Sequence, residues 1–326
     1  DYYRDSRAGR PVVAEDPMMI ASADKTNRAA LGQQLLAGGM CCVVAGLGRS
    51  GVSAARYLSR HGHHVRITDS REDPPGLAEL ADERALFDLS LGGLDEDALG
   101  GADMLVLSPG LSPQEPIVAA ARERGVPVVG DVELFARVAT SAVIAVTGSN
   151  GKSTVCSMLA EMLPAAGMRI RAGGNLGTPA LDLLGDGEPD AYVLELSSFQ
   201  LDLTASLRPR VAALLNISAD HLDRHGDMDA YVAAKAKNFR GCDIAVFNRD
   251  DSVVTKLRPQ TCPGISFGLD VPGPGDWGLR RHAGDVWLAR GDEKVVPVTL
   301  DVCAVGARSI SQYILNDSPD DFMQRL

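Results

Sequence analysis

Residues 142–154 read AVIAVTGSNGKST, an apolar and β-branched run that leads into a glycine-rich turn. The segment after the turn has helical period, because apolar residues recur at intervals of three and four between Val155 and Leu163. A strand, a glycine turn and a helix in this order predict a phosphate-binding loop. The curled backbone points N–H groups inward, and the helix N-terminus adds partial positive charge.

The spacing within this loop is tighter than that of the general P-loop, which has glycine six residues before the lysine, where this chain has Val146. An ordinary strand–turn–helix connection with a surface lysine is the alternative. We favour phosphate binding because Lys-Ser-Thr opens the helix directly, so that Lys152 can reach terminal phosphates and Ser153 can take a Mg²⁺ position. The predicted cofactor-binding residues are Gly148, Ser149, Asn150, Gly151, Lys152, Ser153 and Thr154.

The composition limits the partners of the chain. Its 326 residues are 45% hydrophobic, enough for two or three domains with cores of their own. The net charge of -11 argues against nucleic acid or an anionic membrane as the main partner. Six cysteines without a C-x-x-C pair indicate reduced thiols in a cytosolic protein. Without a membrane-length apolar run or a visible signal peptide, we expect a cytoplasmic protein, and a monomer.

A second glycine-rich loop precedes the first. An apolar run at 40–45 leads into GLGRSG at 46–51, then a helical stretch, then a strand that ends at Asp69. G-x-G-x-x-G between a strand and a helix, with an acid about twenty residues on, indicates a dinucleotide or nucleotide site. A tight structural turn is the alternative. Further strands at 103–107 and 126–129 predict a parallel sheet, whose carboxyl edge would gather the loops after 45, 68 and 107.

The later strands of the second unit also end in chemistry-bearing residues. The strand at 191–194 delivers Glu195, and the strand at 211–215 leads toward His221. Each residue alone is ordinarily solvated or structural. If both strands neighbour the one before Lys152, all three residues stand at one sheet edge, which favours Mg²⁺-ATP. From Thr261 onward, turns and a strand pair near the end of this region indicate an antiparallel appendage.

These motifs together resemble the Mur ligase family, and within it the branch that adds D-glutamate. ELSSFQL is the most specific marker, because the branches for other amino acids differ there, and the tight phosphate loop is also the family's version. The segments that carry the resemblance are GLGRSGVSAARYL (46–58), SPGLSP (108–113), GDVELFAR (130–137), AVTGSNGKSTV (145–155), GGNLGTPALDLL (173–184), YVLELSSFQLD (192–202), LNISADHLDRHG (215–226) and YVAAKAKNF (231–239).

The resemblance implies an α/β fold, with a Rossmann-like parallel-sheet N-terminal domain followed by a P-loop-type α/β ATPase domain. We expect a tail at 1–39 with a short helix at 27–36, a UDP-binding domain at 40–139 and a central ATP-binding domain at 140–301. Residues 302–326 would form a divergent tail where the family continues into a C-terminal ligase domain. We therefore expect that this chain alone does not complete a ligation.

The resemblance also implies a reaction and its residues. UDP-N-acetylmuramoyl-L-alanine would be phosphorylated by ATP with Mg²⁺ on its alanyl carboxylate, and D-glutamate would attack the acyl phosphate. Lys152, Glu195, His221 and Lys235 would be catalytic. Ser153 and Glu195 would bind one Mg²⁺, and His221 would hold a second Mg²⁺ together with a carbamylated Lys235. The implied substrate-binding residues are Leu47, Arg49, Ser50, Asp69, Ser70, Arg71, Ser108, Pro109, Gly110, Asn175, Ser197 and Gln200.

Three other functions compete with this interpretation. An NAD(P)-dependent oxidoreductase would use the loop at 46–51, but it leaves the Lys152 loop and the pair Glu195 and His221 unexplained. A non-catalytic nucleotide-binding module is compatible with the expected absence of a third domain. A ligase like folylpolyglutamate synthase is a third possibility, against which ELSSFQL and the first-domain motifs argue.

Overall fold

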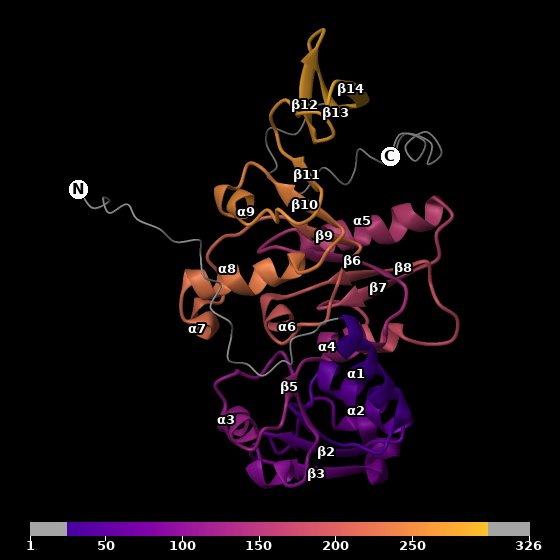
Figure 1. Ribbon diagram of the computed structural model, residues 1–326, viewed down its shortest axis with the longest axis vertical. Helices are drawn as coiled ribbons and strands as arrows, with labels where there is room; N and C mark the ends of the chain where they lie inside the picture. The colour runs from indigo at the N-terminus through magenta and orange to yellow at the C-terminus, as the bar shows by residue number, and fades with distance from the viewer. Residues whose placement is uncertain (1–24, 299–326) are drawn as a thin grey trace, which may run out of the picture.

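The structure, a computed structural model, describes residues 25–298, which form two α/β units stacked along the long axis (Figure 1). The first unit contains a five-stranded parallel sheet in the order β3-β2-β1-β4-β5. Its strands are β1 (Cys41–Ala45), β2 (His64–Asp69), β3 (Phe87–Leu91), β4 (Met104–Leu107) and β5 (Val128–Val129). Its helices are α1 (Lys25–Ala37), α2 (Arg49–Arg60), η1 (Ala78–Leu86), η2 (Glu96–Leu99), α3 (Pro116–Glu123) and α4 (Asp131–Val138).

The second unit is built on a nine-stranded sheet in the order β14-β13-β12-β11-β10-β9-β6-β8-β7. Its strands are β6 (Ala142–Thr147), β7 (Ile170–Gly174), β8 (Ala191–Glu195), β9 (Val211–Leu214), β10 (Ile244–Asn248), β11 (Gly264–Phe267), β12 (Trp277–His282), β13 (Asp285–Arg290) and β14 (Glu293–Val298). Its helices are α5 (Lys152–Ala165), η3 (Ala180–Leu183), α6 (Ser198–Asp202), α7 (Leu222–His225), α8 (Met228–Ala236), η4 (Lys237–Phe239) and α9 (Ser252–Lys256).

Strand register brings three strand ends to one edge, as the sequence predicted. β6 lies between β8 and β9, and all three run parallel. Val146 is in register with Glu195, and Thr147 with Leu214. The loops that follow these strands therefore emerge side by side at the carboxyl edge, where parallel α/β sheets bind ligands.

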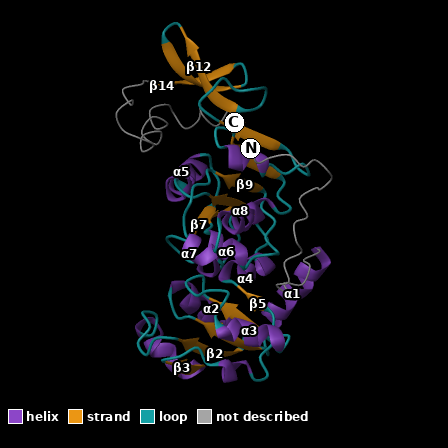
Figure 2. Ribbon diagram, turned by 90° about the vertical axis from the view of Figure 1, so that its left-hand side faces the viewer, coloured by secondary structure: helices purple, strands orange, loops and turns teal. Residues whose placement is uncertain are grey.

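Helix α4 joins the two units, because it lies between their sheets (Figure 2). Phe135 of α4 is fully buried and meets the ring of Tyr192 of β8 edge-on, at 5.0 Å between centroids and 88° between planes. Both residues belong to one continuous apolar core that also contains residues of α2 and η3. The hydrophobic effect thus acts across the junction, and the two units share buried surface.

The predicted antiparallel appendage is confirmed, with β12, β13 and β14 pairing antiparallel at the end of the second sheet (Figure 1). Among residues 25–298, no helix has the length and apolar character that a membrane span requires.

The helix predicted at 27–36, within the tail expected at 1–39, is confirmed, because α1 covers those residues and packs on α4. Leu35 is buried there, and Arg28 donates to the carbonyl oxygen of Ala139 at 2.8 Å. Strands β3 and β7 were missed, because each is a sheet edge with a weak apolar run. Expectations for residues 1–24 and 299–326 lie outside the described residues.

Candidate functional site

The phosphate loop connects β6 to α5 through two glycines with clear steric reasons. Gly151 caps α5 with φ of 81°, a left-handed conformation that glycine adopts without strain. A Cβ on Gly148 would lie 3.0 Å from Cβ of Leu215, a tight contact that would require the loop or the segment after β9 to shift. The first N–H groups of α5 have no partner within the helix and face the space beyond its N-terminus. Ser153 and Thr154 are exposed there.

The segment after β9 holds the loop in place. Asn216 Oδ1 accepts from the N–H of Asn150 at 2.8 Å, and Asn216 Nδ2 donates to the carbonyl of Asn150 at 3.0 Å. The hydroxyl of Ser149 is turned inward, where it donates to the carbonyl of Ser218 and meets the hydroxyl of Tyr231. Sequence reasoning missed Asn216 and Tyr231 as supports. Asn216 follows the end of a predicted strand and Tyr231 lies on the predicted helix that holds Lys235, and these positions were the only indication of their role.

Two lysines converge on one carbonyl oxygen of the loop. Lys152 Nζ donates to the carbonyl of Gly148 at 3.0 Å and to that of Ser149 at 3.1 Å. Lys235 Nζ, from α8, donates to the same carbonyl of Gly148 at 2.9 Å. The two nitrogens are therefore no further apart than the sum of two hydrogen bonds.

Lys235 is 2% exposed, and this burial has an electrostatic consequence. Burial is the main cause that lowers the pKa of Lys235 to about 7, the charge of Lys152 lowers it further, and Asp220 acts in the opposite direction. A large part of the Lys235 amines is therefore neutral near pH 7, and a neutral amine is nucleophilic.

Glu195 lies on the other side of the loop, at the end of β8. It is buried, and its Oε1 accepts from Nδ2 of Asn175 at 2.9 Å. The Asn175 N–H also donates to the backbone carbonyl of Glu195 at 2.8 Å. Gly174 permits this close approach, because a Cβ there would lie 2.3 Å from that carbonyl oxygen. The predicted residues Glu195 and Asn175 are thus brought together.

His221 stands at this edge but apart from Glu195 and Lys235 in the contacts that the structure records. Its backbone is left-handed, with φ of 52°, its side chain is half exposed, and its ring lies 5.0 Å from that of Phe199. Within residues 25–298, no group of three or more His, Cys, Asp or Glu side chains could hold a metal by itself. Mg²⁺ is commonly held by one or two carboxylates together with substrate phosphates, so this finding does not conflict with a nucleotide-bound ion.

The aromatic cluster beside His221 was not predicted. Phe199 packs between the guanidinium of Arg224, 4.1 Å from its centroid, and the ring of His225, which is stacked at 5.3 Å. Burial is the main cause that lowers the pKa of His225, whose Nε2 pairs with Ser198 Oγ at 2.9 Å. The cluster ties the ELSSFQL segment to α7, and therefore to His221.

In the first unit, Asp69 is fully engaged by protein donors. Its carboxylate binds Arg71 through two side-chain hydrogen bonds of 2.8 Å and accepts the N–H of Leu47 at 2.6 Å. Burial alone would raise the pKa of Asp69, but these hydrogen bonds outweigh it and lower that pKa. In a dinucleotide site the corresponding acid accepts ribose hydroxyls. Here those lone pairs are occupied, which argues against the oxidoreductase.

The other predicted residues of the first unit surround the N-terminus of α2. A Cβ on Gly46 would lie 2.8 Å from Ser108 Cβ, so the loop at 108–110 packs directly on the loop at 46–51. Arg49, Ser70 and Arg71 are exposed nearby, and Arg49 donates to the carbonyl of Gly177 in the second unit. The side chain of Leu47 is buried in the core, its N–H donates to Asp69, and its carbonyl oxygen accepts from the N–H of Gly76.

Ser197 and Gln200 form a capping box at the start of α6. Gln200 Oε1 accepts from the N–H and the hydroxyl of Ser197, both at 3.2 Å, and Gln200 Nε2 donates to Asp131 Oδ2 at 3.2 Å. Gln200 is 1% exposed. Both ends of its amide bind protein atoms, so its predicted role in positioning the substrate would be exercised through Ser197 and Asp131.

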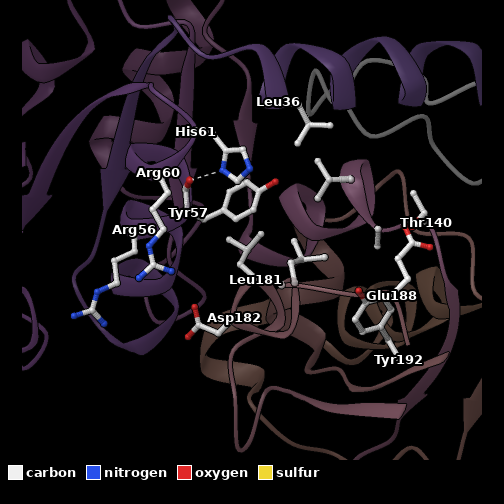
Figure 3. A pocket seen from close by; sticks show the side chains of 14 residues that line it. Leu36, Arg56, Tyr57, Arg60, His61, Thr140, Leu181, Asp182, Glu188 and Tyr192 are labelled. Atoms are coloured by element: carbon white, nitrogen blue, oxygen red, sulfur yellow. Dashed lines mark hydrogen bonds between the residues drawn. The ribbon is translucent and has the colours of Figure 1, made fainter. Parts of the chain in front are cut away.

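A crevice of about 540 Å³ lies elsewhere on the junction between the units. Figure 3 shows Arg56, Tyr57 and Arg60 of α2 facing Leu181, Asp182, Glu188 and Tyr192 of the second unit. None of the predicted site residues lines this crevice, so it is distinct from the loop cluster described above.

Comparison with known proteins agrees with this architecture. The family model of the Mur ligase MurD-like N-terminal domain matches residues 40–130, and that of the Mur ligase middle domain matches residues 146–280. A solved structure of UDP-N-acetylmuramate:L-alanyl-gamma-D-glutamyl-meso-diaminopimelate ligase from Neisseria meningitides has a TM-score of 0.54 and 21% identity, covering 79% of this chain and 86% of that one. At this identity the likeness shows the fold alone.

The two domain models match in order and together span most of the chain, so the chain belongs to the Mur ligase family. Within it, the chain is similar to curated UDP-N-acetylmuramoylalanine–D-glutamate ligases. It is 49% identical to that of Nitrosococcus oceani over 254 residues, and 48% identical to that of Acinetobacter baylyi over 255 residues. Each match covers 78% of this chain and 56% of the relative, so the chain spans little more than half the relatives' length.

Proposed function

We propose that the described part of this chain binds UDP-N-acetylmuramoyl-L-alanine and Mg²⁺-ATP, and serves the ATP-dependent ligation of D-glutamate to that substrate in peptidoglycan precursor synthesis. The proposal extends to an acyl-phosphate intermediate. It is supported by the names of the curated relatives and by the loops that meet at the carboxyl edges of both sheets.

The convergence of two lysines on the Gly148 carbonyl carries the proposal for the second domain. Lys152 supplies the positive charge at this carbonyl, and its charge together with burial keeps much of the Lys235 amine neutral near pH 7. The N-terminus of α5 adds a partial positive charge at the same place. A polyphosphate matches this arrangement better than a neutral ligand or a single carboxylate would.

The residues around the loop also fit a hard cation. The exposed hydroxyl of Ser153 and the carboxylate of Glu195 provide oxygen ligands, which Mg²⁺ prefers. When bound, the ion would neutralise charge that develops on the transferred phosphate. Lys235, as a carbamate, would add an anionic oxygen ligand in place of a cation. We include His221 in this proposal as a metal ligand together with Lys235.

The chain's own residues have separable tasks in this proposal. Lys152 would leave the carbonyls of Gly148 and Ser149 and bind a terminal phosphate oxygen. Asn216 would hold the loop backbone in place, because it accepts from the N–H of Asn150 and donates to the Asn150 carbonyl. Asn175 would orient the carboxylate of Glu195 by its hydrogen bond. Phosphoryl transfer depends mainly on such positioning and charge stabilisation.

We propose a uridine nucleotide, and not NAD, as the ligand of the first domain. Asp69 supports this, because its carboxylate is already committed to Arg71 and to the Leu47 N–H. The backbone N–H groups in the first turn of α2, those of Arg49 and Ser50 among them, would receive the diphosphate. A monomeric, cytoplasmic protein without a nucleic-acid or membrane partner completes the proposal, supported by the net charge of -11.

Calorimetric titration of the chain with UDP-N-acetylmuramoyl-L-alanine, Mg²⁺-ATP and NADH, run side by side, tests the proposal. We expect the first two ligands to bind and NADH to bind more weakly than either. Tighter binding of NADH would show that the first domain has been misassigned. Failure of Mg²⁺-ATP to bind would contradict the interpretation of the two lysines.

A further inference from the structure

A buried carboxylate connects two groups of predicted substrate residues. Asp131 begins α4 and is 2% exposed. Its Oδ2 accepts from Ser50 Oγ at 2.8 Å and from Gln200 Nε2 at 3.2 Å. Ser50 lies in the first turn of α2 in the N-terminal domain, whereas Gln200 lies on α6 in the middle domain. One oxygen atom therefore joins the two domains at their predicted substrate loops.

The contacts on both sides are directional. Gln200 Oε1 already accepts from Ser197, so the nitrogen end of the amide must face Asp131. Ser50 has one hydroxyl hydrogen, and the contact with Asp131 uses it. A displaced carboxylate would thus reorient the Ser50 hydroxyl and, through Gln200, the Ser197 end of α6.

Burying the Asp131 carboxylate also costs free energy, and a role in packing alone does not explain why a charged group stands here. Within the described residues, Asp131 Oδ1 is buried without a hydrogen-bond partner. Burial raises the pKa of Asp131, against the opposing hydrogen bonds from Ser50 and Gln200. A side chain that only filled space would be less costly here if it were apolar. An apolar residue could not accept the two hydrogen bonds that Oδ2 receives from Ser50 and Gln200.

We infer that Asp131 is a positioning residue for the uridine-linked substrate, holding Ser50 and the Gln200–Ser197 pair in one register across the two domains. The inference rests on the proposed function, because it names the ligand of the same site. Asp131 itself is covered by these residues and acts through them.

Helix α2 offers a matched control one turn further on. Ser53 Oγ donates to Asp182 Oδ1 at 2.7 Å, again from a serine of α2 to an aspartate, here on η3 of the middle domain. Neither Ser53 nor Asp182 belongs to the predicted site. Removing Asp182, which is more exposed than Asp131, therefore deletes a serine–aspartate hydrogen bond from the domain junction and leaves the substrate loops unchanged.

The experiment is a titration of UDP-N-acetylmuramoyl-L-alanine into the full chain for the wild type, D131A, D131N and D182A, with urea unfolding of each. We expect D131A to raise Kd about tenfold, roughly the effect of one hydrogen bond. D131N should stay within about threefold of the wild type, because an amide oxygen still accepts both bonds. D182A should lower the free energy of unfolding and leave Kd within about twofold of the wild type.

A double-mutant cycle with S50A adds a readout that a merely structural role would not move. D131A combined with S50A should raise Kd by less than the product of the two single effects, because Asp131 acts partly through Ser50. If D131A does not fold, D131S replaces it, since serine is too short to reach both partners.

The outcomes separate the two proposals. The inference is overturned if D131A or D131S binds the substrate with wild-type affinity, or if D182A loses as much affinity as D131A does. The proposed function stands in either case. Absence of binding to the wild-type chain overturns the proposed function, and with it this inference.

Discussion

Replacing Lys152 by alanine tests the phosphate loop most directly. The ammonium group of Lys152 has two carbonyl partners, at 3.0 and 3.1 Å. Binding exchanges these neutral acceptors for a charged phosphate oxygen, so only the excess strength of the charge-assisted bond contributes to affinity. That excess is about 2 kcal/mol for a partly desolvated lysine, which corresponds to a loss of about thirtyfold in affinity for Mg²⁺-ATP.

The same substitution should leave the fold nearly unchanged. Lys152 bonds only to carbonyls of its own loop, and Asn216 holds that loop independently. We expect the free energy of unfolding to change by no more than about 1 kcal/mol. Lys256, an exposed residue at the end of α9, provides a control that removes the same charge at a distance.

Isothermal titration of Mg²⁺-ATP into the wild type, K152A and K256A gives the comparison, with urea unfolding of each variant. K256A should bind within about twofold of the wild type, because exposed charges are screened by solvent and salt. If K152A bound Mg²⁺-ATP as tightly as K256A did, the phosphate would not lie at Lys152 and the assignment of this loop would be wrong.

Three further results are expected. With Mg²⁺ and ¹³C-bicarbonate, NMR should detect a protein-bound carbamate that is absent in K235Q, because neutral Lys235 amine is available near pH 7; an equal signal in K235Q would refute this. The pKa of Asp69 is lowered in the folded state, so the stability that its ionised form contributes is present above about pH 4 and is lost as pH falls through the folded pKa. Urea unfolding should therefore show a lower free energy of unfolding for D69N than for the wild type at pH 7. This difference should become smaller in acid, because protonated Asp69 no longer pairs with Arg71. A difference that did not change with pH would show that the ionised form of Asp69 contributes no stability. F135A should lower the free energy of unfolding by about 3–5 kcal/mol, because it opens a cavity against Tyr192 at the domain junction, whereas a loss below about 1 kcal/mol would show that the two units do not share a core.

Local sequence pattern was sufficient for the elements around the site. The run at 142–147 became β6, and the helical period after Gly151 became α5, because both patterns express which face of a short segment is buried. The same pattern led to Glu195 at the end of β8, since parallel strands place their carboxyl ends together. It missed the edge strands β3 and β7, whose apolar faces are only partly covered.

By itself, the sequence determined the α/β class, the strand, glycine turn and helix at 142–165, and which residues emerge at strand ends, because these follow from interactions between near neighbours along the chain. Only the tertiary structure decided that Lys235 shares the Gly148 carbonyl with Lys152, that Gln200 faces inward, and that Asp131 links both domains. In the sequence, Asp131 appears only as part of the GDVELFAR segment, with no indication of its contacts. These contacts join residues 69 to 87 positions apart, and burial and hydrogen bonding at that separation depend on how the two sheets pack together, which no local period records.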